Sequence, residues 1–206
     1  AVQNSTASAA TDEWYSKHFG CSESYAEPHV QYEFCKSRGM TLVTLTDHDT
    51  IDGGLQLLDR PDFFLSEEVT TTFPENGCTI HVLTWNITPA QHDRIQAVRA
   101  SVYDLVELLR REPIAHACAH PLVSTNWKLD AGTLEKILVL FPVLEGTNGL
   151  TDRRIARDLH DILAGATPDR IAALAAQHRL AMAPGPYGAL TAGSDDHAHR
   201  ICGSCY

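Results

Sequence analysis

The sequence lacks the features that would assign it to a membrane or a secreted class. It has no apolar run as long as 18 residues, and a membrane-spanning helix needs about that length, so we expect no transmembrane segment. It does not open with methionine or with a charged and then apolar leader, so we expect no signal peptide. It also shows no internal repeat and no low-complexity tract.

Basic residues are scarce in the chain. Lysine and arginine together number 16 against 26 acidic residues, which gives a net charge of −10. A protein that binds nucleic acid needs basic side chains to displace the counterions of the phosphates, so we expect no nucleic-acid partner. A small phosphate compound that is held by metal ions is still compatible with this charge.

The cysteines do not form a recognisable disulfide or zinc pattern. Their even number is weak evidence for disulfides, and a reduced, cytoplasmic protein is the better expectation. The spacing of Cys202 and Cys205 gives one C-x-x-C pair, but no second pair accompanies it, so we expect no metal or redox site there. The six cysteines are Cys21, Cys35, Cys78, Cys118, Cys202 and Cys205.

What the chain does contain is typical of one globular α/β domain. Its 206 residues, 44% apolar and 20% charged, suit a single domain over residues 1–206 with a sizeable core. Predicted strands alternate with predicted helices, which favours a largely parallel sheet or barrel. Asn76-Gly77 predicts a hairpin. Thr88-Pro89 begins the longest predicted helix, whose apolar stripe extends to Leu109 and whose first turn holds His92, expected to be solvated.

Acidic and histidine side chains recur where the predicted strands end. Asp47 and His48 follow the apolar segment 40–45 and precede a turn. In α/β proteins the C-terminal ends of the strands form the functional rim. Four further predicted strands bring similar groups to the same setting: Glu68, His81, His120, Asp195 and His197.

Such groups are costly to place together unless a partner compensates them. A bound metal ion is the simplest partner, and neutral imidazole and carboxylate suit zinc, manganese or iron. Any single histidine could be a hydrogen-bonded structural residue, but six candidates at five strand ends favour a metal site.

The motifs resemble those of the PHP domain, the polymerase and histidinol phosphatase superfamily, and most closely its stand-alone bacterial members with a Thr-Asp-His-Asp-Thr signature. The resemblance spans nearly the whole chain. It implies a distorted (β/α)7 TIM-like barrel, up to three metal ions at the C-termini of the strands, and hydrolysis of a phosphoester by metal-activated water. It is carried by residues 46–50, 66–72, 81–83, 119–121 and 193–197, with 13–14 and 20–28.

The resemblance also implies roles for individual residues. Glu68, the expected bridging carboxylate, would form one nearly complete site with His81 and His120. Asp195 would serve a second ion, and His48 with His197 a third. The implied metal ligands are therefore His48, Glu68, His81, His120, Asp195 and His197, for one to three divalent Zn, Mn or Fe ions.

Some of these residues, and some of their neighbours, have a second interpretation. His48 and His197 could act as a general acid instead of binding a metal ion, and Asp47 could orient His48 or accept a proton. Asp47 could equally cap the following helix. Glu145 and Asn148 resemble a polar pair that orients metal ligands in the family, or they belong to a turn with an exposed glutamate.

The sequence departs from the family at its first strand. The register places Val2 and Asn4 where a His-x-His pair is expected, and Ala9 or Ala10 where a further ligand is expected. Two hypotheses therefore stay open. The chain is an active phosphoesterase with fewer metal ions, acting on a small phosphorylated substrate, or it is a degenerate relative that acts as a binding or regulatory module. Other metal-dependent barrels, such as amidohydrolases, are the alternative fold.

Overall fold

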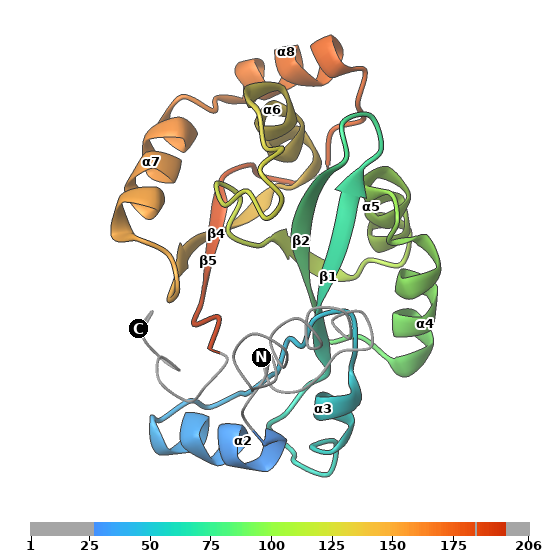
Figure 1. The fold of residues 1–206 in the computed structure, drawn as a ribbon, viewed down its shortest axis with the longest axis vertical. Coiled ribbons are helices and arrows are strands. Elements are labelled where there is room, and N and C mark those ends of the chain that lie inside the picture. Colours follow the sequence, from blue (N-terminus) through green and yellow to red (C-terminus); the bar gives the residue numbers. More distant parts are fainter. Residues whose placement is uncertain (1–26, 184, 197–206) are drawn as a thin grey trace.

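A computed structural model describes residues 27–183 and 185–196 (Figure 1). Five strands in this part of the chain form one sheet in the order β1-β2-β3-β4-β5. Among these residues, no helix is long and apolar enough to cross a bilayer. The elements are α2 (Pro28–Ser37), α3 (Asp52–Leu55), β1 (Ser66–Phe73), β2 (Cys78–Trp85), α4 (Pro89–Val98), α5 (Val102–Arg111), β3 (Ala115–Cys118), α6 (Ala131–Leu140), β4 (Val143–Asn148), α7 (Arg153–Ala164), α8 (Pro168–His178) and β5 (Ala189–Gly193).

The sheet is mixed because β1 and β2 form the predicted hairpin. Gly77 has a φ of 68°, and the side-chain oxygen of Asn76 accepts a hydrogen bond from the Cys78 backbone N–H at 2.8 Å. These features allow the tight turn, so β2 runs antiparallel to β1, and it also runs antiparallel to β3. The pairs β3–β4 and β4–β5 are parallel. Strand β2 is therefore the one that runs against the other four.

The expected (β/α)7 TIM-like barrel is wrong for the part of the chain that the structure describes, where the sheet is small and open. Strand β2 is antiparallel to both of its neighbours, β1 and β3, whereas a parallel barrel requires parallel neighbours joined by helical crossovers. The predicted strand 40–45 is reduced to irregular backbone, with the isolated parallel bridges Val43–Phe63 and His48–Glu68. Strand β3 is short and pairs with β4 through Cys118 and Leu144 alone. The predicted first strand lies outside the described residues.

The main core lies between the sheet and the helices α4, α5, α6, α7 and α8 (Figure 1). Side chains alternate across a strand, so Val69 and Phe73 of β1 enter this core while Glu68 points to the opposite face. The long helix expected after Thr88 is interrupted. Thr88 does cap α4, but Ser101 caps a separate helix, α5, by accepting a hydrogen bond from the Asp104 backbone N–H.

A smaller core attaches α2 to the segment that carries the Asp-His-Asp motif. Tyr32 and Cys35 of α2 are buried with Val43, Leu45 and Leu57. This cluster seats the segment 43–48 beside β1, where backbone hydrogen bonds complete the contact. The fold therefore delivers His48 to the face of the sheet that carries Glu68.

Candidate metal centre

Glu68 is the centre of the polar cluster on this face of the sheet. Its side chain is almost fully buried, and its backbone N–H donates to the Asp47 carbonyl at 3.0 Å. The Asp49 N–H in turn donates to the Glu68 carbonyl at 3.0 Å. These two bonds form the bridge that places His48 beside Glu68. Three ligand atoms, one each from His48, Glu68 and His81, lie within 4.8 Å of one another.

His81 and His120 direct their ring nitrogens at the same carboxylate oxygen. The Oε1 atom of Glu68 lies 3.0 Å from Nδ1 of His81 and 3.3 Å from Nε2 of His120. The two nitrogens are 3.2 Å apart. Ligand atoms about 2.0–2.1 Å from a tetrahedral zinc ion lie about 3.3–3.4 Å from one another. The three atoms therefore have nearly the spacing of one face of a tetrahedral site, and they can hold a divalent ion.

The electrostatics of this triangle favour a negative carboxylate. Burial alone would raise the pKa of Glu68, but hydrogen bonds from His120 and His81 outweigh it and hold the pKa well below its ordinary value. Burial would lower the pKa of His120, whereas the contact with Glu68 raises it above its ordinary value. The Nδ1 atom of His120 is buried without a partner among the described residues, so Nε2 is the nitrogen that faces the cluster.

A second layer of polar groups holds His120 from behind. The Oε2 atom of Glu145 accepts hydrogen bonds from the His120 backbone N–H at 2.9 Å and from Nδ2 of Asn148 at 3.0 Å. Asn148 also donates to Asp195 at 3.1 Å. Burial raises the pKa of Glu145, which is only 5% exposed, so the expectation of an exposed glutamate in a turn is wrong. The network connects the ends of β3, β4 and β5.

The backbone is unusual at three of these positions. Asp49, His120 and Asp195 have φ values of 57°, 27° and 51°. Residues other than glycine seldom occupy this region, and such conformations cluster at sites where the surrounding structure enforces them. His120 and Asp195 belong to the polar cluster itself, and Asp49 lies in the segment whose backbone is hydrogen-bonded to Glu68.

The structure thus assembles most of the residues predicted from the sequence. His48, Glu68, His81 and His120 lie together, and Asp195 joins them through Asn148. Their service as metal ligands stays a prediction. His197 lies outside the described residues, as do the first-strand positions Val2, Asn4, Ala9 and Ala10.

The two aspartates that flank His48 are both buried, but they differ in setting. Asp49 accepts a hydrogen bond from the Thr70 backbone N–H at 2.7 Å and forms an ion pair with Arg99 at 3.3 Å. It therefore stabilises the turn beside β1. The alternative that Asp47 caps the following helix is wrong, because α3 begins at Asp52 with Ile51 in the capping position.

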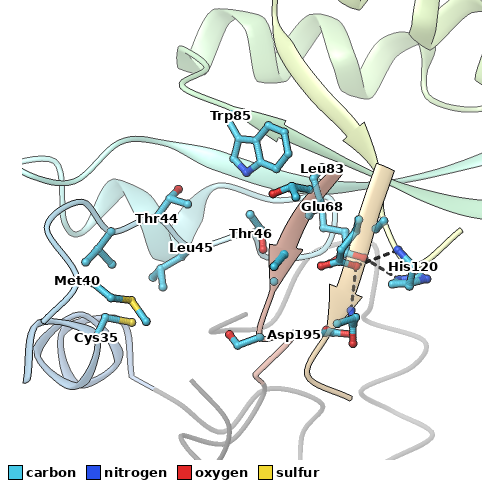
Figure 2. Close-up of a pocket in the computed structure, with 18 of the residues that line it drawn as sticks. Cys35, Met40, Thr44, Leu45, Thr46, Glu68, Leu83, Trp85, His120 and Asp195 are labelled. Atoms are coloured by element: carbon cyan, nitrogen blue, oxygen red, sulfur yellow. Dashed lines mark hydrogen bonds and ion pairs between the residues drawn. The ribbon is translucent and has the colours of Figure 1, made fainter. Parts of the chain in front are cut away.

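A cavity of about 320 Å³ opens onto the cluster (Figure 2). Glu68, His120 and Asp195 lie at one end of it, and side chains from α2 and the segment 40–46 form the other. The sequence did not identify the cavity residues Gln31 and Trp85. The available signal for Gln31 was its helical spacing from Cys35, which places a polar side chain on the buried face of α2.

The sequence also missed a buried ion pair on the reverse face of β1. Glu67 is fully buried, and its Oε2 atom contacts Nδ1 of His92 and Nε2 of Gln96, each at 2.9 Å. The expectation that His92 is solvated is therefore wrong. The hydrogen bond with Glu67 raises the pKa of His92 above its ordinary value.

We expect a pH-dependent stability that belongs to His92. Because the folded pKa is raised, the contribution is complete below the ordinary pKa of about 6.5 and is lost as pH rises through the folded pKa. His92→Gln keeps a donor but cannot carry the charge. Urea unfolding should show that wild type exceeds this variant by about 1 kcal/mol more near pH 5.5 than near pH 8.5. The control is His29→Gln, because His29 is exposed. An equal change with pH in the unfolding free energy of both variants, relative to wild type, would contradict the assignment to His92.

Comparisons with known proteins give a likeness of fold alone. No protein-family model and no curated protein sequence matches the chain. A candidate metal-dependent phosphoesterase from Bifidobacterium adolescentis is similar in structure, with a TM-score of 0.51 and 13% identity over 87% of this chain and 91% of that one. An amidohydrolase from Chromobacterium violaceum, solved with bound sulfate and no metal, has a TM-score of 0.51 and 14% identity over 87% and 89%.

Proposed function

We propose that the protein is a metal-dependent hydrolase that acts on a small phosphate ester. The observation that carries the proposal is the triangle of Glu68 Oε1, His81 Nδ1 and His120 Nε2, with sides of 3.0 to 3.3 Å. The fold shared with a candidate phosphoesterase and an amidohydrolase supports it at the level of architecture. The Thr-Asp-His-Asp-Thr motif supports a distant relationship to the PHP superfamily.

The donor set suits zinc, manganese or iron, because it combines a carboxylate with imidazoles. A divalent ion held there would lower the pKa of water and neutralise charge on the phosphoryl oxygens. Glu68, His81 and His120 would hold this ion, and Glu145 would keep His120 in position through its backbone N–H. Asp195 lies at the edge of the same network and would serve a second ion.

The remaining histidine of the cluster is suited to proton transfer. The ring of His48 lies against that of His81, with centroids 4.7 Å apart, and it is only partly buried. An imidazole can donate a proton to a leaving alkoxide at neutral pH. We therefore assign His48 as a ligand of a further ion or, without one, as the general acid. Asp47, which precedes His48 in the chain, is proposed to orient it or to accept a proton. His197 is proposed as the other ligand of that ion or as an alternative general acid.

A non-catalytic binding or regulatory role is the second candidate. Val2 and Asn4 occupy the positions where the resemblance calls for two histidines, so one ion would lose most of its ligands. In that case the cluster around Glu68 would serve only to stabilise the fold.

One experiment separates the two functions. The protein is purified without added metal, its metal content is measured by elemental analysis, and the same sample is assayed with an unselective phosphoesterase substrate. We expect one or two ions per chain, with turnover that a strong chelator abolishes and added metal restores. Turnover that survives complete metal removal would contradict the proposal. Absence of both metal and turnover would favour the binding module.

A further inference from the structure

We propose that the substrate is a phosphate monoester of an apolar, aromatic-sized alcohol or phenol, and that Trp85 and its neighbours select it. The inference rests on the proposed function for its reaction and on the cavity for its specificity. The cavity volume of about 320 Å³ lies at the lower end of the range of small-molecule pockets, so it suits a compact ligand.

The sheet itself forms an apolar path that leads away from the candidate metal centre. Residues two apart in a strand share a face, so His81, Leu83 and Trp85 form a row along β2. Leu83 pairs directly with Glu68 of β1. At about 3.3 Å per residue, Trp85 lies about 13 Å along the strand from His81. A phosphoryl group at the triangle therefore leaves its organic substituent facing Leu83 and Trp85.

Apolar side chains form much of the far end of the cavity, where Thr44 and Thr46 also line it. The hydroxyl of Thr44 is already hydrogen-bonded to the Phe64 carbonyl and to Ser66. Figure 2 shows Cys35, Met40 and Leu45 at the end beside α2, opposite Glu68, His120 and Asp195. Removing apolar surface from water contributes roughly 25 cal/mol per Å², and flat aromatic rings supply such surface at a small cost in conformational entropy. This end of the cavity therefore favours an apolar body over a polyhydroxylated one.

The charges of the lining argue against a second phosphate. Among the described residues that line the cavity, the carboxylates are Glu68, Glu145 and Asp195, and there is no lysine or arginine. A second anionic group would be desolvated beside carboxylates without a cation to pair with. A single phosphoryl group at the metal end is therefore the anion that this cavity accommodates.

The test measures binding of non-hydrolysable phosphonates to the metal-loaded protein by calorimetry. Phenylphosphonate should bind about 10- to 100-fold more tightly than methylphosphonate, as expected for burial of one ring. Trp85→Ala should reduce this ratio about tenfold, and Trp127→Ala, which alters a side chain that is 93% exposed, should leave it unchanged.

A second variant protects the test against misfolding of Trp85→Ala. Leu42 lines the cavity but is 64% exposed, so Leu42→Asp should fold and should also reduce the preference for the phenyl compound. Equal affinity for phenyl- and methylphosphonate, or tighter binding of a sugar bisphosphate, would overturn the inference.

Turnover on benzyl phosphate and glycerol phosphate, both esters of aliphatic alcohols, separates the inference from the function on which it rests. A higher kcat/KM for benzyl phosphate supports both. Hydrolysis of the two esters with equal kcat/KM overturns the specificity alone. A phenyl preference in binding without turnover on either ester overturns the proposed reaction and leaves the cavity assignment supported.

Discussion

Replacing Glu68 with glutamine is expected to release the bound metal ion and to lower kcat/KM at least about a thousandfold. The carboxylate contributes the atom that both His81 and His120 face, and it is the negative charge of the triangle. Glutamine keeps the shape but offers a neutral and weaker ligand. A metal ion supplies several kcal/mol of transition-state stabilisation, and each 1.36 kcal/mol is a factor of ten in rate, which gives the expected magnitude.

The neighbouring Glu67 provides a matched control. It is also buried, but it lies on the reverse face of β1 and contacts His92 and Gln96 of α4. Glu67→Gln should therefore retain the metal content and most of the turnover, with a loss of stability only. Elemental analysis and steady-state kinetics on both variants check the prediction. A full metal complement in Glu68→Gln would contradict the assignment of the site.

Replacing Gly193 with alanine is expected to weaken metal binding about 10- to 100-fold, the usual effect of disturbing a group that orients a ligand. A Cβ atom at Gly193 would lie 2.3 Å from Oε1 of Glu145. Glu145 cannot swing aside freely, because its Oε2 atom is bonded to the His120 backbone and to Asn148. Displacing Glu145 should therefore move His120. Forced repacking of a buried group should also cost about 1–3 kcal/mol of unfolding free energy.

Gly165→Ala is the control for this substitution. Gly165 ends α7 with a φ of −91°, and its Cβ atom would meet only the Ile162 carbonyl at an ordinary 3.5 Å. The φ of Gly193 is not in the left-handed range either, so alanine adds no backbone strain at either position. Competition with a metal-sensitive dye should show weaker binding for Gly193→Ala alone. Unchanged affinity in both variants would remove Glu145 from the positioning of His120.

The sequence predicted correctly those features of the fold that depend on a few adjacent residues. The Asn76-Gly77 turn and the Thr88 cap depend on a few adjacent residues, and both are present. The candidate ligands were recognisable because charged groups at strand ends have few purely structural explanations. The expected barrel was wrong because closure depends on how distant strands pair. Segment 40–45 makes only the isolated bridge Val43–Phe63, and the contact with β1 is the single bridge His48–Glu68.

Contacts between distant elements account for the residues that the sequence missed. His92 looked like a surface residue because its helix turn is polar, but its partner Glu67 lies 25 positions earlier in the chain. Gln31 and Trp85 share the cavity only because the small core around Tyr32 and Leu45 seats α2 against the segment beside β1. Neither the contact of His92 with Glu67 nor the shared position of Gln31 and Trp85 at the cavity produces a periodic pattern in the sequence.

The adjacent glutamates of β1 also bear on the fidelity of folding. A slip of one residue in the pairing of β1 with β2 would exchange the faces of Glu67 and Glu68, so each face would still receive a carboxylate. The acidic pair therefore cannot discriminate the correct alignment from the slipped one. Val69 and Phe73 can, because the slip would expel both from the main core and bring threonines into it. The apolar residues of this strand thus protect the chain from a misaligned state that its acidic residues would tolerate.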